Sequence, residues 1–152
     1  MLQQRINSLS LLLFLLFMLS ATFAGAQEKK VRGGLKKARE FYIMGDSLYD
    51  QGLYDSAAGY FELAGRIYER KGKLYVASKS YILGAESYFN SNQYKLARKI
   101  AKKALLLINI VDLSMNAREV LVFLKIQLLL GWIFMVEEEY DTAIYYFKSG
   151  MR

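Results

Sequence analysis

Apolar residues recur three and four positions apart along the chain from residue 35 onward, as at Phe61, Ala64 and Tyr68. This spacing is the period of an α-helix that buries one face, and no strand-like alternation competes with it. Polar turns that contain Gly or Asn interrupt the pattern, because these residues tolerate the left-handed backbone that ends a helix. The pattern predicts an all-α domain with helices near residues 35–51, 54–71, 74–91, 94–110, 115–137 and 140–151.

Three stretches of the chain, which begin at Phe41, Tyr81 and Gln127, share one order of residue types. Each has a small residue in a first helix, a polar turn, a Tyr, and an Ala three residues after the Tyr. We expect the small residues and alanines to let paired helices approach closely, and the tyrosines to begin the second helix and fill the wedge at the turn. The small residues are Gly45, Ala85 and Gly131, the tyrosines are Tyr54, Tyr94 and Tyr140, and the alanines are Ala57, Ala97 and Ala143.

This order resembles the tetratricopeptide repeat (TPR) over residues 38–152, most fully in the first stretch, which has Gly45, Gly52, Tyr54, Ala57, Phe61 and Ala64. The family's tryptophan is replaced and its closing proline is missing. The alanines Ala57, Ala97 and Ala143 lie 40 and 46 residues apart, against about 34 in the standard repeat. Resemblance to a longer-period variant implies a right-handed α-solenoid of three helix-turn-helix pairs, near residues 38–71, 78–111 and 124–152, joined at residues 71–73 and 111–114.

A solenoid needs a polar helix over its last pair, and none follows residues 140–151 here. We expect Ile144, Phe147 and Met151 to lie partly in water. The sequence therefore favours a repeat domain that is incomplete at its C-terminus and belongs to a longer protein. The alternative is that this edge docks on further repeats or on another copy of the chain.

The first 26 residues match a secretory signal peptide. Arg5 is followed by an apolar run over Leu9–Leu19 and by the small residues Ala24-Gly25-Ala26. We expect cleavage near Ala26 and export to the periplasm or the extracellular space, followed by a basic, flexible lead-in over residues 27–34. An uncleaved membrane anchor over residues 9–24 is the alternative, although a spanning helix needs about 20 apolar residues.

The composition bears on chemistry more than on fold. The 152-residue chain has no His, Cys or Pro and a formal net charge of +7. The sequence therefore has no imidazole base, no His or Cys ligand for zinc and no thiol nucleophile. It also has no phosphate-binding glycine loop. We therefore expect no enzyme, no metal and no cofactor. The acidic run Glu137-Glu138-Glu139 is interpreted as a turn whose charges favour the start of the next helix.

The resemblance implies that a protein or peptide ligand lies in the concave groove formed by the first helix of each pair. Acidic and aromatic residues at one end and apolar ones at the other would suit a ligand with basic and hydrophobic residues. The alternative is that half of these side chains only pack between repeats. The candidate groove residues are Tyr42, Asp46, Tyr49, Ile82, Glu86, Phe89, Leu128, Trp132 and Met135.

A cationic stripe follows the fourth predicted helix at spacings of three and four residues, at Lys95, Arg98, Lys99, Lys102 and Lys103. It is a candidate contact for anionic lipid headgroups of a membrane or envelope complex, or for an acidic partner. The alternative is an ordinary solvated convex face. Nucleic acid is disfavoured because an exported chain rarely meets it.

The run Val120–Val136 is apolar except for Lys125, Gln127 and Gly131. It is short for a membrane span, and a central Lys is costly in a bilayer. We expect a helix that neighbouring repeats bury on both sides.

These observations favour a non-catalytic protein–protein interaction scaffold outside the cytoplasm. Two alternatives stay open: the N-terminal sensor portion of a larger membrane-bound signalling protein, and a structural component of an envelope assembly.

Overall fold

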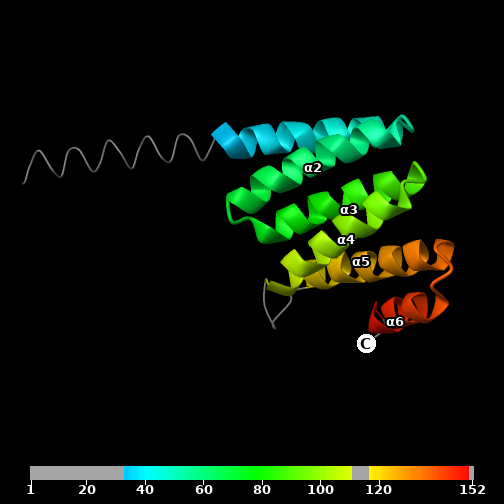
Figure 1. Cartoon of the computed structure of the whole chain (residues 1–152). Helices are drawn as coiled ribbons and strands as arrows, with labels where there is room; N and C mark the ends of the chain where they lie inside the picture. The colour runs from blue at the N-terminus through cyan, green and yellow to red at the C-terminus, as the bar shows by residue number, and fades with distance from the viewer. Residues whose placement is uncertain (1–32, 111–116, 151–152) are drawn as a thin grey trace, which may run out of the picture. The chain divides into compact units, whose positions relative to one another are not determined.

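The computed structural model of the chain describes residues 33–110 and 117–150, which are helical apart from short turns (Figure 1). Residues 33–50 form the first described helix. It is followed by α2 (Tyr54–Arg70), α3 (Leu74–Asn90), α4 (Tyr94–Ile110), α5 (Ala117–Val136) and α6 (Tyr140–Gly150).

The predicted all-α class is confirmed, and the helix ends that fall on described residues agree with prediction to within two residues. Gly33 and Gly34, expected in the lead-in of residues 27–34, are helical, and the rest of that lead-in lies outside the described residues. The expected signal peptide, the linker at residues 111–114 and Met151 lie outside the described residues.

Four three-residue turns with one backbone geometry join the helices on the described residues. Each has a residue with positive φ, namely Gly52 (75°), Gly72 (68°), Asn92 (60°) and Glu138 (62°). In the first turn, the Leu53 N–H donates to the Leu48 carbonyl at 2.9 Å, and equivalent bonds close the other three. This is the Schellman arrangement, which satisfies the last carbonyls of a helix. Because the turns are short, consecutive helices run antiparallel and pack on one another.

The fourth residue of the helix after each of these turns is alanine: Ala57, Ala77, Ala97 and Ala143. Each donates its N–H to the carbonyl of the last turn residue, as Ala57 does to Leu53 at 3.0 Å, and each is 0% exposed. The predicted burial of Ala57, Ala97 and Ala143 is confirmed. Ala77 was not predicted, because the predicted repeat is a pair of helices, whereas Ala57, Ala77 and Ala97 recur once per helix.

Glycines face aromatic rings at three places where helices cross. A methyl group on Gly45 would lie 3.0 Å from the Phe61 ring, and one on Gly131 would overlap the Phe147 ring. The third pair, Gly65 with Tyr81, was not predicted. In all three pairs the ring follows the glycine by sixteen residues. The predicted role of Gly45 and Gly131 in close helix packing is therefore confirmed.

The expectation for the tyrosines holds at two turns and is wrong at the third. Tyr54 and Tyr94 begin α2 and α4 and pack edge-on against Tyr49 and Phe89, with ring centroids 5.1 and 5.4 Å apart. Tyr140 begins α6 but is 57% exposed. The residue that takes the place of Tyr49 and Phe89 in α5 is the aliphatic Met135, so no ring holds Tyr140 in the wedge.

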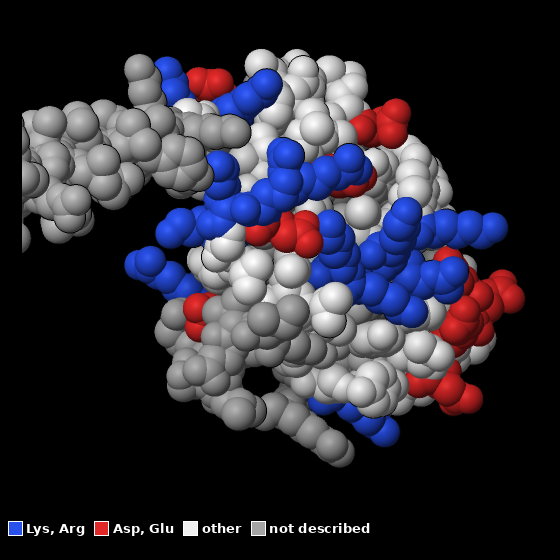
Figure 2. Space-filling view, turned by 60° about the vertical axis from the view of Figure 1, so that its left-hand side comes forward, with Lys and Arg blue, Asp and Glu red and all other residues white. Residues whose placement is uncertain are grey.

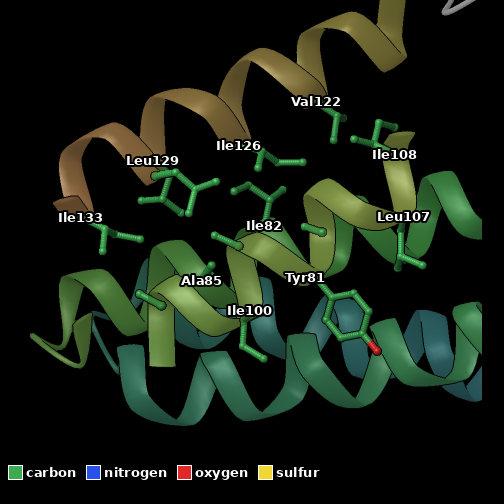
Figure 3. Close-up of a cluster of buried hydrophobic side chains, with 14 of the residues drawn as sticks. Tyr81, Ile82, Ala85, Ile100, Leu107, Ile108, Val122, Ile126, Leu129 and Ile133 are labelled. Atoms are coloured by element: carbon green, nitrogen blue, oxygen red, sulfur yellow. The ribbon is translucent and has the colours of Figure 1, made fainter. Parts of the chain in front are cut away.

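One hydrophobic core runs through α3, α4 and α5 (Figure 3). Its largest fully buried side chain is Tyr81, whose hydroxyl donates to Glu69 Oε2 at 2.6 Å. Lys103 of α4 bonds the same carboxylate at 2.8 Å and lies over the Tyr81 ring. Burial and the hydrogen bond to Glu69 raise the pKa of Tyr81 to about 12, so the hydroxyl stays a donor that links α2 to α3.

The prediction that α5 is buried on both sides is wrong. Its residues Val122, Ile126 and Leu130 enter the core, but Leu121 is 59% exposed and Trp132 is 54% exposed. By length and composition α5 also qualifies as a possible membrane span, and it is the one helix of the described residues that does. A sequence that is apolar all round does not indicate which side of the helix its neighbours cover.

Candidate ligand-binding face

The nine predicted groove residues come from three elements: the helix of residues 33–50, α3 and α5. Tyr42, Tyr49, Glu86 and Phe89 are half-buried, whereas the others except Ile82 are exposed. Ile82 is 1% exposed and points from α3 toward Ile126 and Leu129 of α5 (Figure 3). The prediction that Ile82 lines an open groove is wrong, because α5 packs directly across it.

Four of the remaining residues form an acidic and aromatic cluster. Burial raises the pKa of Tyr42, and the nearby carboxylates of Asp46 and Glu86 raise it further. Burial and Glu86 likewise raise the pKa of Tyr49. The two phenols and two carboxylates therefore share one electrostatic environment, although they come from different helices.

The rings of this cluster are held in place by contacts behind them. The Tyr42 ring packs edge-on against Phe61 at 5.6 Å between centroids, and the Tyr49 hydroxyl accepts a hydrogen bond from Asn90 Nδ2 at 2.8 Å. Since Asn90 ends α3, this bond joins the two helices that carry the cluster. Both tyrosines near the carboxylates are therefore held in place.

Glu86 is the unusual member of the cluster. Burial raises the pKa of its carboxyl, and the positive charge of Lys125 offsets part of that effect. Within the part of the chain that the structure describes, no hydrogen bond or ion pair reaches this carboxylate. The charge of Lys125 therefore offsets only part of the hydration that this half-buried carboxylate loses, and Glu86 favours the approach of a further cation or a hydrogen-bond donor.

Two lysines near the cluster were missed by the sequence reasoning. Lys79 lies over the Tyr42 ring with its Nζ 5.7 Å from the centroid, and Lys125 acts on Glu86. Both fall at the same position in their helices, because they are 46 residues apart like Ala97 and Ala143. This alignment could have found them. The face therefore carries both signs of charge and is not purely acidic.

The apolar end of the predicted groove lies on α5. Leu128 is 50% exposed, Trp132 54% and Met135 36%. The Trp132 ring packs edge-on against Phe147 of α6 at 5.6 Å between centroids, so its position is fixed although much of it faces solvent.

The cationic stripe of α4 is only partly free. Figure 2 shows Lys and Arg side chains gathered on one face, with acidic side chains at the border of the group. Arg98 pairs with Glu137 at 2.8 Å and Glu139 at 3.5 Å, and Lys103 pairs with Glu69. These two predicted docking residues thus serve contacts between helices. Lys95, Lys99 and Lys102 are exposed, and Lys102 also lies over the Phe134 ring at 5.3 Å.

The acidic run at the α5–α6 turn has a structural role that its sequence did not reveal. Glu137 and Glu139 hold Arg98, and the Glu137 side chain is only 18% exposed. Among the described residues, no group of acidic side chains is arranged to hold a metal ion.

A separate open depression of about 450 Å³ lies along α2, between Gly59, Leu63 and Tyr88. Its carboxylate, Glu62, is already satisfied by Arg66 at 2.8 Å and by the Tyr88 hydroxyl at 2.7 Å. The depression therefore offers a ligand no unpartnered polar group comparable with Glu86.

No protein-family model matches the chain, and no curated protein matches it as a relative. The class of protein is therefore defined by the described residues alone. They form an all-α protein in which each helix packs on its neighbours in sequence.

Proposed function

We propose that this protein is a non-catalytic interaction module, built as a TPR-like solenoid of helix pairs, that binds a protein or peptide segment along the face carrying Tyr42, Tyr49 and Glu86. The recurring turn and the buried alanine that follows it support the repeat architecture. The cluster around Glu86 supports the binding role, because this half-buried carboxylate acts on Tyr42 and Tyr49, two tyrosines that are held in place.

The chemistry of the cluster favours a ligand with a basic residue. A lysine or arginine side chain of the ligand would give Glu86 the partner it lacks and would lie against the tyrosine rings, where cations are favoured. Asp46 is exposed beside this position and adds a second negative charge. Aliphatic residues next to the basic one would contact the half-buried Phe89.

Selection of random peptides on phage against the purified chain tests this function. We expect enrichment of peptides with Lys or Arg beside apolar residues, and loss of that enrichment with Glu86→Gln or Tyr42→Ala. Glu40→Gln is the matched control, since Glu40 is exposed on the same helix as Tyr42. Enrichment of acidic peptides, or of the same peptides by Glu86→Gln, would contradict the proposal.

We also propose that the module acts outside the cytoplasm. The support is the apolar run Leu9–Leu19 followed by Ala24-Gly25-Ala26. Sequencing the N-terminus of the protein recovered from cells tests this, because cleavage after Ala26 would leave Gln27 first. A chain that keeps Met1 and sediments with membranes would instead support the anchor over residues 9–24.

A further inference from the structure

The exposed side of α5 and α6 carries residues whose counterparts earlier in the chain are covered. Leu128 is the counterpart of Ile82, since the two are 46 residues apart like Ala97 and Ala143. Ile82 is 1% exposed under Ile126 and Leu129 of the next first helix, α5, whereas Leu128 is 50% exposed (Figure 3). The packing of α5 on Ile82 therefore shows what kind of surface would cover Leu128.

The same comparison holds at two further positions. Trp132 is the counterpart of Glu86, whose pKa the charge of Lys125 on α5 lowers, and Ile144 is the counterpart of Arg98, which pairs with Glu139 before α6. Trp132 is 54% exposed and Ile144 is 46% exposed. On the described residues, therefore, no side chain takes the place of Lys125 or Glu139 over these two.

The opposite side of the domain carries residues that match the covering ones. Ile43, counterpart of Leu129, is 56% exposed, and Leu53, counterpart of Glu139, is 51% exposed. Arg39 is the exposed counterpart of Lys125. All three residues lie in the helix of residues 33–50 or in the turn after it. Their counterparts lie at the same positions of α5 or its turn, next to the preceding pair, α3 and α4.

We propose that a second copy of the chain docks head-to-tail, with its helix of residues 33–50 on α5 of the first copy. In this arrangement Ile43 covers Leu128, Arg39 lies over the Trp132 ring, and Leu53 covers Ile144. The interface continues the one by which α5 already packs on α3. A contact between unlike surfaces of this kind extends into an open stack of copies.

A change of residue type at matched positions favours a copy of this chain over an unrelated partner. Where Arg98 meets an acid inside the chain, both members of the proposed contact, Ile144 and Leu53, are apolar. Where the charge of Lys125 acts on the acid Glu86, the proposed contact offers an aromatic ring and a guanidinium, which also attract one another. The paired ions Lys36 and Glu40 precede Ile43 by seven and three residues on the same helix and suit the polar rim of an interface.

The absence of cysteine from the chain allows a direct test by disulfide cross-linking. The full chain is made as Ile43→Cys and, with a tag of different size, as Leu128→Cys. The two are mixed under mild oxidation and resolved on a non-reducing gel. A mixture of Leu96→Cys and Leu106→Cys is the control, because both residues are exposed on α4, away from either edge.

We expect the Ile43→Cys and Leu128→Cys mixture to cross-link several-fold more than the control, and each variant alone to stay at the control level. Trp132→Glu in the Leu128→Cys chain should lower this yield without changing helical content, since Trp132 is exposed. Cross-linking of Leu128→Cys with itself would show two α5 edges back to back and overturn the head-to-tail arrangement. Equal yields in mixture and control would overturn the docking of a second copy altogether. The phage selection measures peptide binding at Glu86 on α3, whereas the cross-link measures contact between Ile43 and Leu128, so either proposal can fail without the other.

Discussion

Replacing Gly65 by Ala should destabilise the fold although alanine is the better helix former. The added Cβ would lie 2.8, 2.9 and 3.0 Å from three atoms of the Tyr81 ring. That ring cannot move aside easily, because Tyr81 is 0% exposed and its hydroxyl is bonded to Glu69. An added methylene in a packed core costs about 1–3 kcal/mol, and three close contacts place this case in the upper part of that range. The gain in helix propensity returns about 1 kcal/mol.

Gly59→Ala is the matched control, because Gly59 lies on the same helix and a Cβ there would meet nothing within 4 Å. It should stabilise the protein by about 0.5–1 kcal/mol. We therefore expect the two alanine variants to differ by about 2–3 kcal/mol in the free energy of unfolding. Urea unfolding followed by far-ultraviolet circular dichroism measures this difference.

A double-mutant cycle assigns the cost of Gly65→Ala to the ring. In a Tyr81→Leu background the same substitution should lose most of its penalty, since the aromatic atoms it meets are gone. If Gly65→Ala proves as stable as Gly59→Ala in the chain that keeps Tyr81, the inference that α2 packs closely on α3 through Gly65 is refuted.

Three further predictions rest on single residues. Glu138 has a left-handed backbone that strains a residue with a long side chain, so Glu138→Gly should stabilise by about 1 kcal/mol and Asn92→Gly by less; chemical denaturation compares them, and equal gains would refute the reasoning. Gln127 is 5% exposed and its Oε1 has no hydrogen-bond partner among the described residues, so Gln127→Met should raise stability by about 1 kcal/mol, seen as a higher midpoint of thermal unfolding. Burial raises the pKa of Glu86, so the native state holds this proton more tightly than the unfolded chain. The contribution of Glu86 to the free energy of unfolding falls as the pH rises from the ordinary carboxyl pKa to the raised one. Glu86→Gln should therefore stabilise the protein at neutral pH and have little effect below the ordinary pKa. Urea unfolding at the two pH values measures this, and an equal effect at both would contradict the raised pKa.

Much of the fold could be predicted because its signals are local. Gly52, Gly72 and Asn92 mark turns by their own conformational preference, and the alanines after the turns mark the close approach of helices. The contact of a glycine with a ring is less regular, and Gly65 with Tyr81 was not predicted. Where Gly45 faces Phe61, the corresponding residues of the second pair are Ala85 and Ala101, both 0% exposed, so two small residues stand there in place of a glycine and a ring.

The candidate site was harder to predict because it depends on which helices cover one another. Position within a helix placed Ile82 beside Tyr42 and Glu86, and only the packing of α5 across α3 shows that Ile82 is buried. The cationic stripe failed in part for the same reason: Arg98 and Lys103 find acidic partners that are distant in sequence. Residue type indicates what a side chain can do, but its neighbours in space determine what remains available to a ligand.

The helix α5 is buried on one side and exposed on the other. To cross a membrane it would have to withdraw Ile126, Leu130 and Ile133, each 0% exposed, from contact with α3 and α4. It would also carry Lys125 and Gln127 into hydrocarbon, where both are unfavourable. The apolar outer side of α5 is therefore better covered by protein than by lipid. The helix of residues 33–50 and its turn carry residues suited to cover it. Ile43 and Leu53 stand at the positions from which Leu129 and Glu139 cover the preceding helices, so a second copy can repeat a packing that the first has already made once.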